Sequence, residues 1–147
     1  MHAEIDAVRV AGTPDGPVPV VLLSVDGETD VLPIFVGVDE ARSIAHGIDA
    51  IDIGRPMTHD LTLDIIEELG GRIDRVIVSE LREGTYIADL HLVTPRESVV
   101  IDARPSDSMA MAARTNAPIE VAESVFEEGR EEPEEFEELR DIREVLG

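Results

Sequence analysis

The segment that most strongly indicates the fold is residues 98–107, which read SVVIDARPSD. Its β-branched start predicts a strand from Ser98 to Ala103. The turn after it predicts a helix that continues to Ala113, with Ser106 as its N-cap. A second Arg-Pro turn, Arg55-Pro56, stands before another stretch of helical spacing. Two Arg-Pro turns, Arg55-Pro56 and Arg104-Pro105, are therefore expected to open two helices.

The rest of the chain alternates between strand-like and helical patterns. A helix is expected over Glu40–Ala50, and another from Thr58, as its N-cap, to the stop at Gly70-Gly71. Residues 34–45 and 101–112 have a weakly similar pattern, since each runs from a strand through a turn into an alanine-containing helix. Two such units could place equivalent helix starts on one face of the sheet. The order of elements predicts a single α+β domain with a mixed, largely antiparallel sheet and three or four packed helices. Further strands are expected over residues 4–10, 18–25, 30–36, 72–81, 85–93 and, as the last strand, 118–121.

The C-terminal segment differs from the rest in composition. Residues 1–127 are interpreted as the domain proper, and residues 128–147 as an acidic extension. Phe136, Leu139, Ile142 and Leu146 recur three or four positions apart behind Pro133, a favourable first helical position. This spacing predicts an amphipathic helix that packs on the domain or on a neighbouring subunit.

The charge is strongly negative. The chain has 33 acidic and 12 basic residues, all of them arginine, and a formal net charge of -21. Such a charge repels itself in ordinary buffer, whereas salt at about 1 M shortens the screening length to about 3 Å. The absence of lysine and the acid excess favour adaptation to a salty cytoplasm, as in halophilic archaea. The competing interpretation is an ordinary acidic protein with a disordered tail.

Composition also limits the chemistry and the location. The chain has no cysteine, which excludes disulfides, thiolate-zinc sites and thiol nucleophiles. No run approaches the ~18 apolar residues of a membrane span, and the first residues lack a signal-peptide pattern. We therefore expect a cytoplasmic protein without membrane contact.

The two Arg-Pro turns are candidate anion sites. A helix start presents unpaired N–H groups and a partial positive charge, which an arginine beside it reinforces. The first turn adds Thr58, His59 and Asp60, and the second adds Ser106 and Asp107. Each residue type also has an ordinary structural role, because hydroxyls cap helices, acids favour helix starts and arginine pairs with a nearby aspartate.

Four blocks, in order, give a family resemblance. They are residues 32–37 with Glu40-Ala41, residues 55–61, residues 102–107, and Ala117-Pro118-Ile119. With these blocks the chain resembles the bifunctional nuclease domain, a DNase/RNase family, over about residues 1–127. The resemblance implies a compact α+β domain and, for some members, cleavage of DNA and RNA. Ser108 stands where that family usually has alanine.

The first functional hypothesis is a metal-assisted nuclease. Carboxylates that hold Mg²⁺ or Mn²⁺ can activate water and stabilise charge during phosphodiester hydrolysis. The hypothesis assigns the metal to Asp60, Asp102 and Asp107, and acid–base chemistry to His59 together with Asp60 and Asp107. Phosphate would be bound by Arg55, Thr58, Arg104 and Ser106.

The second hypothesis is a non-catalytic module, a homo-oligomer that binds a small anionic ligand or a protein partner. The net charge of -21 favours it, because nucleic-acid binding normally depends on basic patches. Few aromatic residues are available to stack on bases, since the chain has one tyrosine, three phenylalanines and no tryptophan. The separated motifs make one site only if the two helix starts converge, either within the folded domain or between subunits.

Overall fold

The structure is a computed structural model that describes residues 1–50 and 54–145. Its sheet has the strand order β3-β2-β1-β7-β4-β5-β6, and β8 pairs with β1 beside this path. All pairs are antiparallel except β4 and β7, which run parallel. The predicted mixed, largely antiparallel sheet is thus confirmed. The strands are β1 (His2–Thr13), β2 (Gly16–Val25), β3 (Val31–Phe35), β4 (Arg72–Arg82), β5 (Thr85–Val93), β6 (Ser98–Ala103), β7 (Ile119–Val121) and β8 (Arg140–Asp141).

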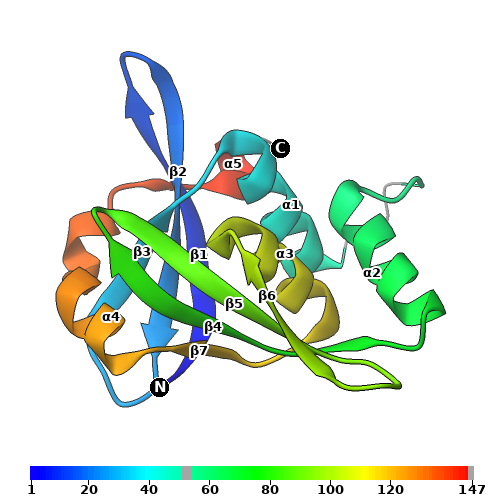
Figure 1. The fold of residues 1–147 in the computed structure, drawn as a ribbon. Helices are drawn as coiled ribbons and strands as arrows, with labels where there is room; N and C mark the ends of the chain where they lie inside the picture. Colours follow the sequence, from blue (N-terminus) through cyan, green and yellow to red (C-terminus); the bar gives the residue numbers. More distant parts are fainter. Residues whose placement is uncertain (51–53, 146–147) are drawn as a thin grey trace.

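The described residues form five α-helices, four of them of seven residues or more, as the α+β prediction required. Figure 1 shows α1 and α3 side by side against the curved sheet, with α2 beyond them and α4 at the opposite side of the molecule. The arrangement brings the starts of α1, α2 and α3 to one region. The helices are α1 (Val38–Asp49), α2 (Thr58–Glu68), α3 (Pro105–Thr115), α4 (Glu123–Gly129) and α5 (Ile142–Val145).

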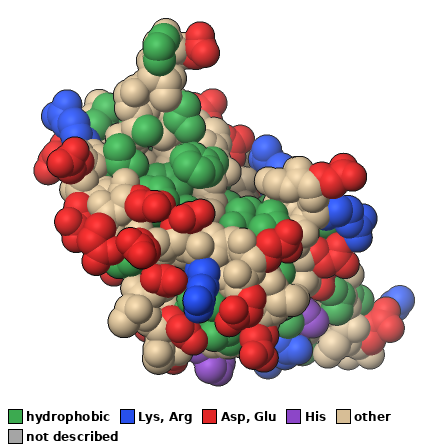
Figure 2. Space-filling model, turned by 90° about the vertical axis from the view of Figure 1, so that its left-hand side faces the viewer, with side chains coloured by type: hydrophobic (Ala, Val, Ile, Leu, Met, Phe, Trp, Pro, Cys, Tyr) green, Lys and Arg blue, Asp and Glu red, His purple; other side chains and the backbone are tan. Residues whose placement is uncertain are grey.

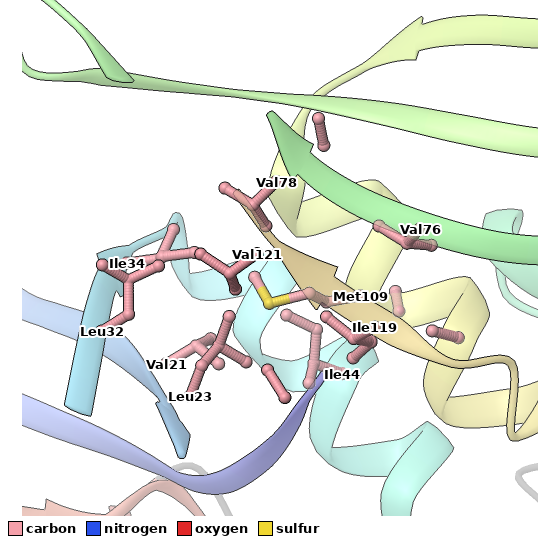
Figure 3. Close-up of a cluster of buried hydrophobic side chains, with 14 of the residues drawn as sticks. Val21, Leu23, Leu32, Ile34, Ile44, Val76, Val78, Met109, Ile119 and Val121 are labelled. Atoms are coloured by element: carbon pink, nitrogen blue, oxygen red, sulfur yellow. The ribbon is translucent and has the colours of Figure 1, made fainter. Parts of the chain in front are cut away.

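The main core lies between the sheet and the α1–α3 pair. Figure 3 shows Met109 of α3 extending toward Val121 of β7, with Ile44 of α1 close by. Met109 and Ile44 are fully buried, and Val121 is nearly so. Alanines at positions 110 and 112 let α3 approach its neighbours closely. This packing fixes the orientation of α1 and α3 relative to each other.

A second, smaller cluster covers the other face of β2. Because side chains alternate along a strand, Val20 and Leu22 point away from the core that holds Val21 and Leu23. Phe136, 8% exposed, packs on them together with Leu139. The C-terminal segment is therefore part of the folded domain.

The predicted amphipathic helix over residues 128–147 is wrong. The described part of this segment, residues 128–145, contains the end of α4, a 3₁₀ turn (Pro133–Phe136), β8 and α5. An α-helix here would place glutamates at i, i+3 and i+4, where like charges repel. The conformation of the segment is instead determined by contacts with the rest of the domain. For example, Arg9 Nη1 of β1 donates to the Leu139 carbonyl at 2.9 Å. Leu146, part of the predicted stripe, lies outside the described residues, and β8 shows that residues 118–121 are not the last strand.

Ile142 provides a test of this docking. Its side chain is 3% exposed in the main core, so Ile142→Ala should lower the free energy of unfolding by about 2–4 kcal/mol. Val145→Ala, at a 38% exposed position in the same helix, should cost less than about 0.5 kcal/mol. Urea denaturation of both proteins in the same high-salt buffer measures the difference. Equal, small effects would mean that the segment does not dock.

Acidic side chains cover much of the surface. Figure 2, which looks onto the side on which α4 lies, shows them across most of that face, with few arginines among them. Within the described residues, no helix has the length and apolar character needed to cross a bilayer.

Candidate functional site

Three helix starts converge on one pocket of about 250 Å³. The N-cap of α1 is Gly37, that of α2 is Met57 and that of α3 is Arg104. The convergence that the nuclease hypothesis required is therefore present. The pocket is lined by Asp39, Glu40 and Ser43 of α1, by Met57, Thr58 and His59 at the start of α2, and by Arg104 and Asp107 at the start of α3.

His59 joins the three helices at this point. Its Nε2 lies 2.8 Å from Asp107 Oδ1, and its Nδ1 lies 2.7 Å from Ser43 Oγ. The imidazole is only 14% exposed. As a neutral ring it can donate from Nε2 and accept from Ser43; as an imidazolium it can donate from both nitrogens. The same contacts thus accommodate both protonation states.

Asp107 has a second partner in Arg104. Arg104 Nε donates to Asp107 Oδ2 at 2.8 Å, and Nη2 donates to Oδ1 at 3.1 Å. Partial burial pushes the pKa of Asp107 upward, but the hydrogen bonds from Arg104 and His59 outweigh it and hold the pKa below its ordinary value. Arg104 is 64% exposed and also lies 3.5 Å from Glu40 Oε1. Asp107 therefore stays ionised, and Arg104 keeps a face toward solvent.

Arg114, whose side chain is largely covered, holds Ser43, the hydrogen-bond partner of His59. Arg114, with a side chain 9% exposed, donates from Nη2 to Ser43 Oγ at 3.1 Å and from Nη1 to the Ser43 carbonyl at 2.9 Å. Its Nε donates to Asp60 Oδ1 at 2.6 Å. Burial raises the pKa of Asp60, but the Arg114 hydrogen bond, the Met57 N–H and the Arg114 charge together hold it below the ordinary value. Asp60 is thus a fixed anion for Arg114 rather than a free carboxylate.

Both predicted N-caps are wrong by one or two residues. Thr58 is the first residue of α2 and Met57 its N-cap, whose N–H donates to Asp60 Oδ2 at 2.9 Å. In α3 the N-cap is Arg104, because Pro105 lacks an N–H and occupies the first helical position. Ser106 is consequently buried inside the first turn, at 6% exposure.

The predicted site residues are only partly brought together. Thr58, His59, Arg104 and Asp107 line the pocket. Arg55 is exposed and makes no hydrogen bond or ion pair with any residue in the ranges 1–50 and 54–145. Asp102 is exposed on β6, opposite Asp89 of β5. Roles for Arg55 and Asp102 stay predictions, without support from their positions.

The proposed metal ligands do not form one group. No cluster of three or more histidine and carboxylate side chains that could hold a metal exists among the described residues, which include Asp60, Asp102 and Asp107. Asp60 is paired with Arg114, and Asp107 with Arg104. The arrangement therefore does not fit a site in which these three carboxylates share Mg²⁺ or Mn²⁺.

Three residues at or behind the pocket were not assigned from the sequence: Glu40, Ser43 and Arg114. Ser43, 2% exposed, sits among the buried residues Ala41, Ile44 and Ala45 of α1. Arg114 follows the buried run of α3 and shares a helix face with Ala110. The sequence signal for Ser43 and Arg114 was a polar side chain on a helix face that otherwise packs against other helices. Such a group needs a hydrogen-bond partner when it is buried.

The fold and this pocket define an α+β domain with a histidine–aspartate pair beside an exposed arginine. Residues 20–134 match the bifunctional nuclease domain, and the chain belongs to that family. It is 41% identical over 108 residues to an uncharacterised protein of Mycobacterium tuberculosis (strain H37Rv), covering 74% of this chain and 64% of that protein.

Plant relatives are more distant. Bifunctional nuclease 2 of Oryza sativa subsp. japonica is 29% identical over 113 residues, which cover 74% of this chain and 35% of the rice protein. Bifunctional nuclease 2 of Arabidopsis thaliana is 29% identical over 105 residues, covering 69% of this chain and 32% of that protein. The chain thus spans about a third of the plant proteins.

Proposed function

We propose that this domain hydrolyses phosphodiester bonds of DNA or RNA at the His59–Asp107 pair. The observation that supports this most directly is the 2.8 Å contact between His59 Nε2 and Asp107 Oδ1, which joins two helix starts 48 positions apart. Family membership and the names of the plant relatives agree with this activity.

The pair can perform both proton transfers that hydrolysis needs. With His59 charged, the Asp107 carboxylate accepts a proton from the attacking water, which ends its hydrogen bond from Nε2, and Nε2 then donates its own proton to the leaving oxygen. Asp107, whose pKa is lowered, then returns this proton to His59 and restores the starting state. Ser43 holds the other ring nitrogen in place throughout.

Arg104 is the group best placed to bind phosphate. Its guanidinium is 64% exposed at the pocket and stands at the start of α3, where the helix dipole also favours an anion. As charge develops on the phosphoryl oxygens, Arg104 can stabilise it while Asp107 keeps the guanidinium oriented. Mg²⁺ or Mn²⁺ stays a prediction, and any such ion would need ligands other than the three carboxylates first assigned to it.

The net charge of -21 favours the alternative, a non-catalytic module that binds a small anion through Arg104. That charge repels a nucleic-acid strand unless salt screens it. The preference for molar salt, the cytoplasmic location and the homo-oligomeric state stay predictions. The two functions differ in one respect: the module binds a small anionic ligand or a protein partner without breaking a bond.

The test is cleavage of an end-labelled single-stranded oligonucleotide by the purified chain, from low to molar salt. Parallel reactions with Mg²⁺, with Mn²⁺ and with a chelator show whether a metal is needed. Arg104→Ala should lower the cleavage rate by roughly 10- to 1000-fold, the usual effect of removing one transition-state donor. Arg96→Ala, at an exposed position in the turn at the far end of β6, should leave it within twofold.

The outcome against the proposal is equally clear. No cleavage by the folded protein under any of these conditions, or equal cleavage by the Arg104→Ala and wild-type proteins, would reject it. Mononucleotide binding without cleavage would support the module instead.

A further inference from the structure

A second pocket, of about 510 Å³, adjoins the candidate site. It shares Glu40 and Arg104 with the His59 pocket, so the two pockets adjoin at this pair. Two helix N-caps also line it, Gly37 of α1 and Arg104 of α3. The two similar segments, residues 34–45 and 101–112, both line this pocket where each passes from strand into helix.

The accessible aromatic rings of the protein are concentrated in this pocket. The chain has four aromatic residues, of which Phe126 is fully buried and Phe136 is 8% exposed. The other two, Phe35 and Tyr86, both line the second pocket. Phe35 is 59% exposed at the end of β3, so much of its side chain is accessible from solvent.

Tyr86 is held in a fixed position beneath the pocket. A Cβ on Gly129 would clash with the Tyr86 hydroxyl oxygen and lie 2.8 Å from a Leu32 methyl group, so only glycine lets α4 approach this closely. Burial, and then the charges of Glu131 and Glu128, raise the pKa of Tyr86, which keeps the ring neutral. A rigid, neutral ring is well suited to contact an uncharged flat group.

We propose that this pocket binds a nucleobase of the substrate, stacked on Phe35, while the adjoining phosphate lies at Arg104. The inference rests on the proposed function, because it places the base next to the phosphodiester that His59 and Asp107 act on. Stacking suits a strongly acidic protein, since it gains affinity from an uncharged face and does not depend on basic patches.

Calorimetric titration of the wild-type chain in molar salt tests the proposal without any cleavage. Adenosine 5′-monophosphate should bind roughly 5- to 150-fold more tightly than ribose 5-phosphate, the range expected for one base stacked on an aromatic ring. Phe35→Ala should remove this difference, and Phe35→Tyr should retain it. Leu69→Ala, which trims a 76% exposed apolar residue at the C-cap of α2, is the matched control and should change nothing.

Binding of a nuclease-resistant phosphorothioate dinucleotide tests whether the pocket prefers a nucleic-acid strand or a free mononucleotide. Tighter binding of the dinucleotide than of the monophosphate supports a strand, and weaker binding overturns that part of the proposal. Equal affinity for the monophosphate and ribose 5-phosphate, or no effect of Phe35→Ala, overturns the base pocket itself.

These outcomes are distinct from failure of the proposed function. A protein that cleaves but does not respond to Phe35→Ala refutes only the base pocket. A protein that binds the monophosphate through Phe35 but cleaves nothing refutes only the nuclease.

Discussion

Asp107→Asn should reduce the oligonucleotide cleavage rate by about 100- to 10,000-fold, the usual contribution of a positioned acid–base group. The amide keeps the shape of the side chain, but it can neither accept the water proton nor balance the charge of His59 and Arg104, both of which contact the wild-type carboxylate. His59→Asn should have an effect of similar size. Single-turnover rates at saturating enzyme measure the chemical step separately from binding.

Two further variants distinguish this site from the metal site first expected from the sequence. Asp64→Asn, at an exposed position of α2, controls for the loss of one negative charge and should leave the rate unchanged. Asp102→Asn should do the same, because Asp102 lies outside the pocket. A large loss in Asp102→Asn, with activity retained in Asp107→Asn, would contradict the His59–Asp107 assignment.

Arg114→Leu should lower the free energy of unfolding by about 2–3 kcal/mol, through loss of a charged donor that satisfies several buried acceptors. Arg114 is only 9% exposed and donates to Asp60, to both oxygens of Ser43 and to the Ala110 carbonyl. The estimate stays below that for a fully buried pair because Asp60 is 38% exposed. Arg130→Leu, which removes a 43% exposed arginine paired with Asp30 at 3.4 Å, should cost less than about 1 kcal/mol.

The same pair predicts a pH dependence. The pKa of Asp60 is lowered below 3.8, so the pairing adds stability above that value and loses it as the pH falls through the lowered pKa of the folded state. Arg114→Leu should therefore remove part of the acid destabilisation expected of the wild-type protein as the pH falls below about 4, namely the part of the Arg114 contribution that depends on ionised Asp60. Thermal unfolding of both proteins across this range measures it, and parallel curves would show that the Asp60–Arg114 pair contributes nothing to it.

Local pattern predicted most of the fold. The β-branched runs and the helical spacings gave α1, α2, α3 and the strands from β1 to β7 within a few residues, because each element has a clear period and a clear stop. The C-terminal segment could not be predicted in this way, since the positions of Phe136 and Ile142 are fixed by two separate clusters. There tertiary contacts override a spacing that fits a helix.

The candidate site was predictable to the extent that it lies in helix starts. His59, Arg104 and Asp107 were assigned from the two Arg-Pro turns, and they do meet. The pairing of Asp60 was not predictable, because its partner is Arg114, 54 positions away, rather than the neighbouring Arg55. Ion-pair partners of this kind depend on how helices pack, which the local sequence does not specify.

The meeting of the helix starts also has a consequence for how the protein folds. The β1–β2 and β4–β5 hairpins are local and can form early, whereas β7 must insert between β1 and β4, which joins Ala3 to Ile119. The chain between such distant strands forms a long loop that closes late, because conformational entropy is lost on closure before the stabilising contacts form. His59 reaches Asp107 only once α2 and α3 have docked, so recovery of activity during refolding should trail the formation of secondary structure and report the last stage of assembly.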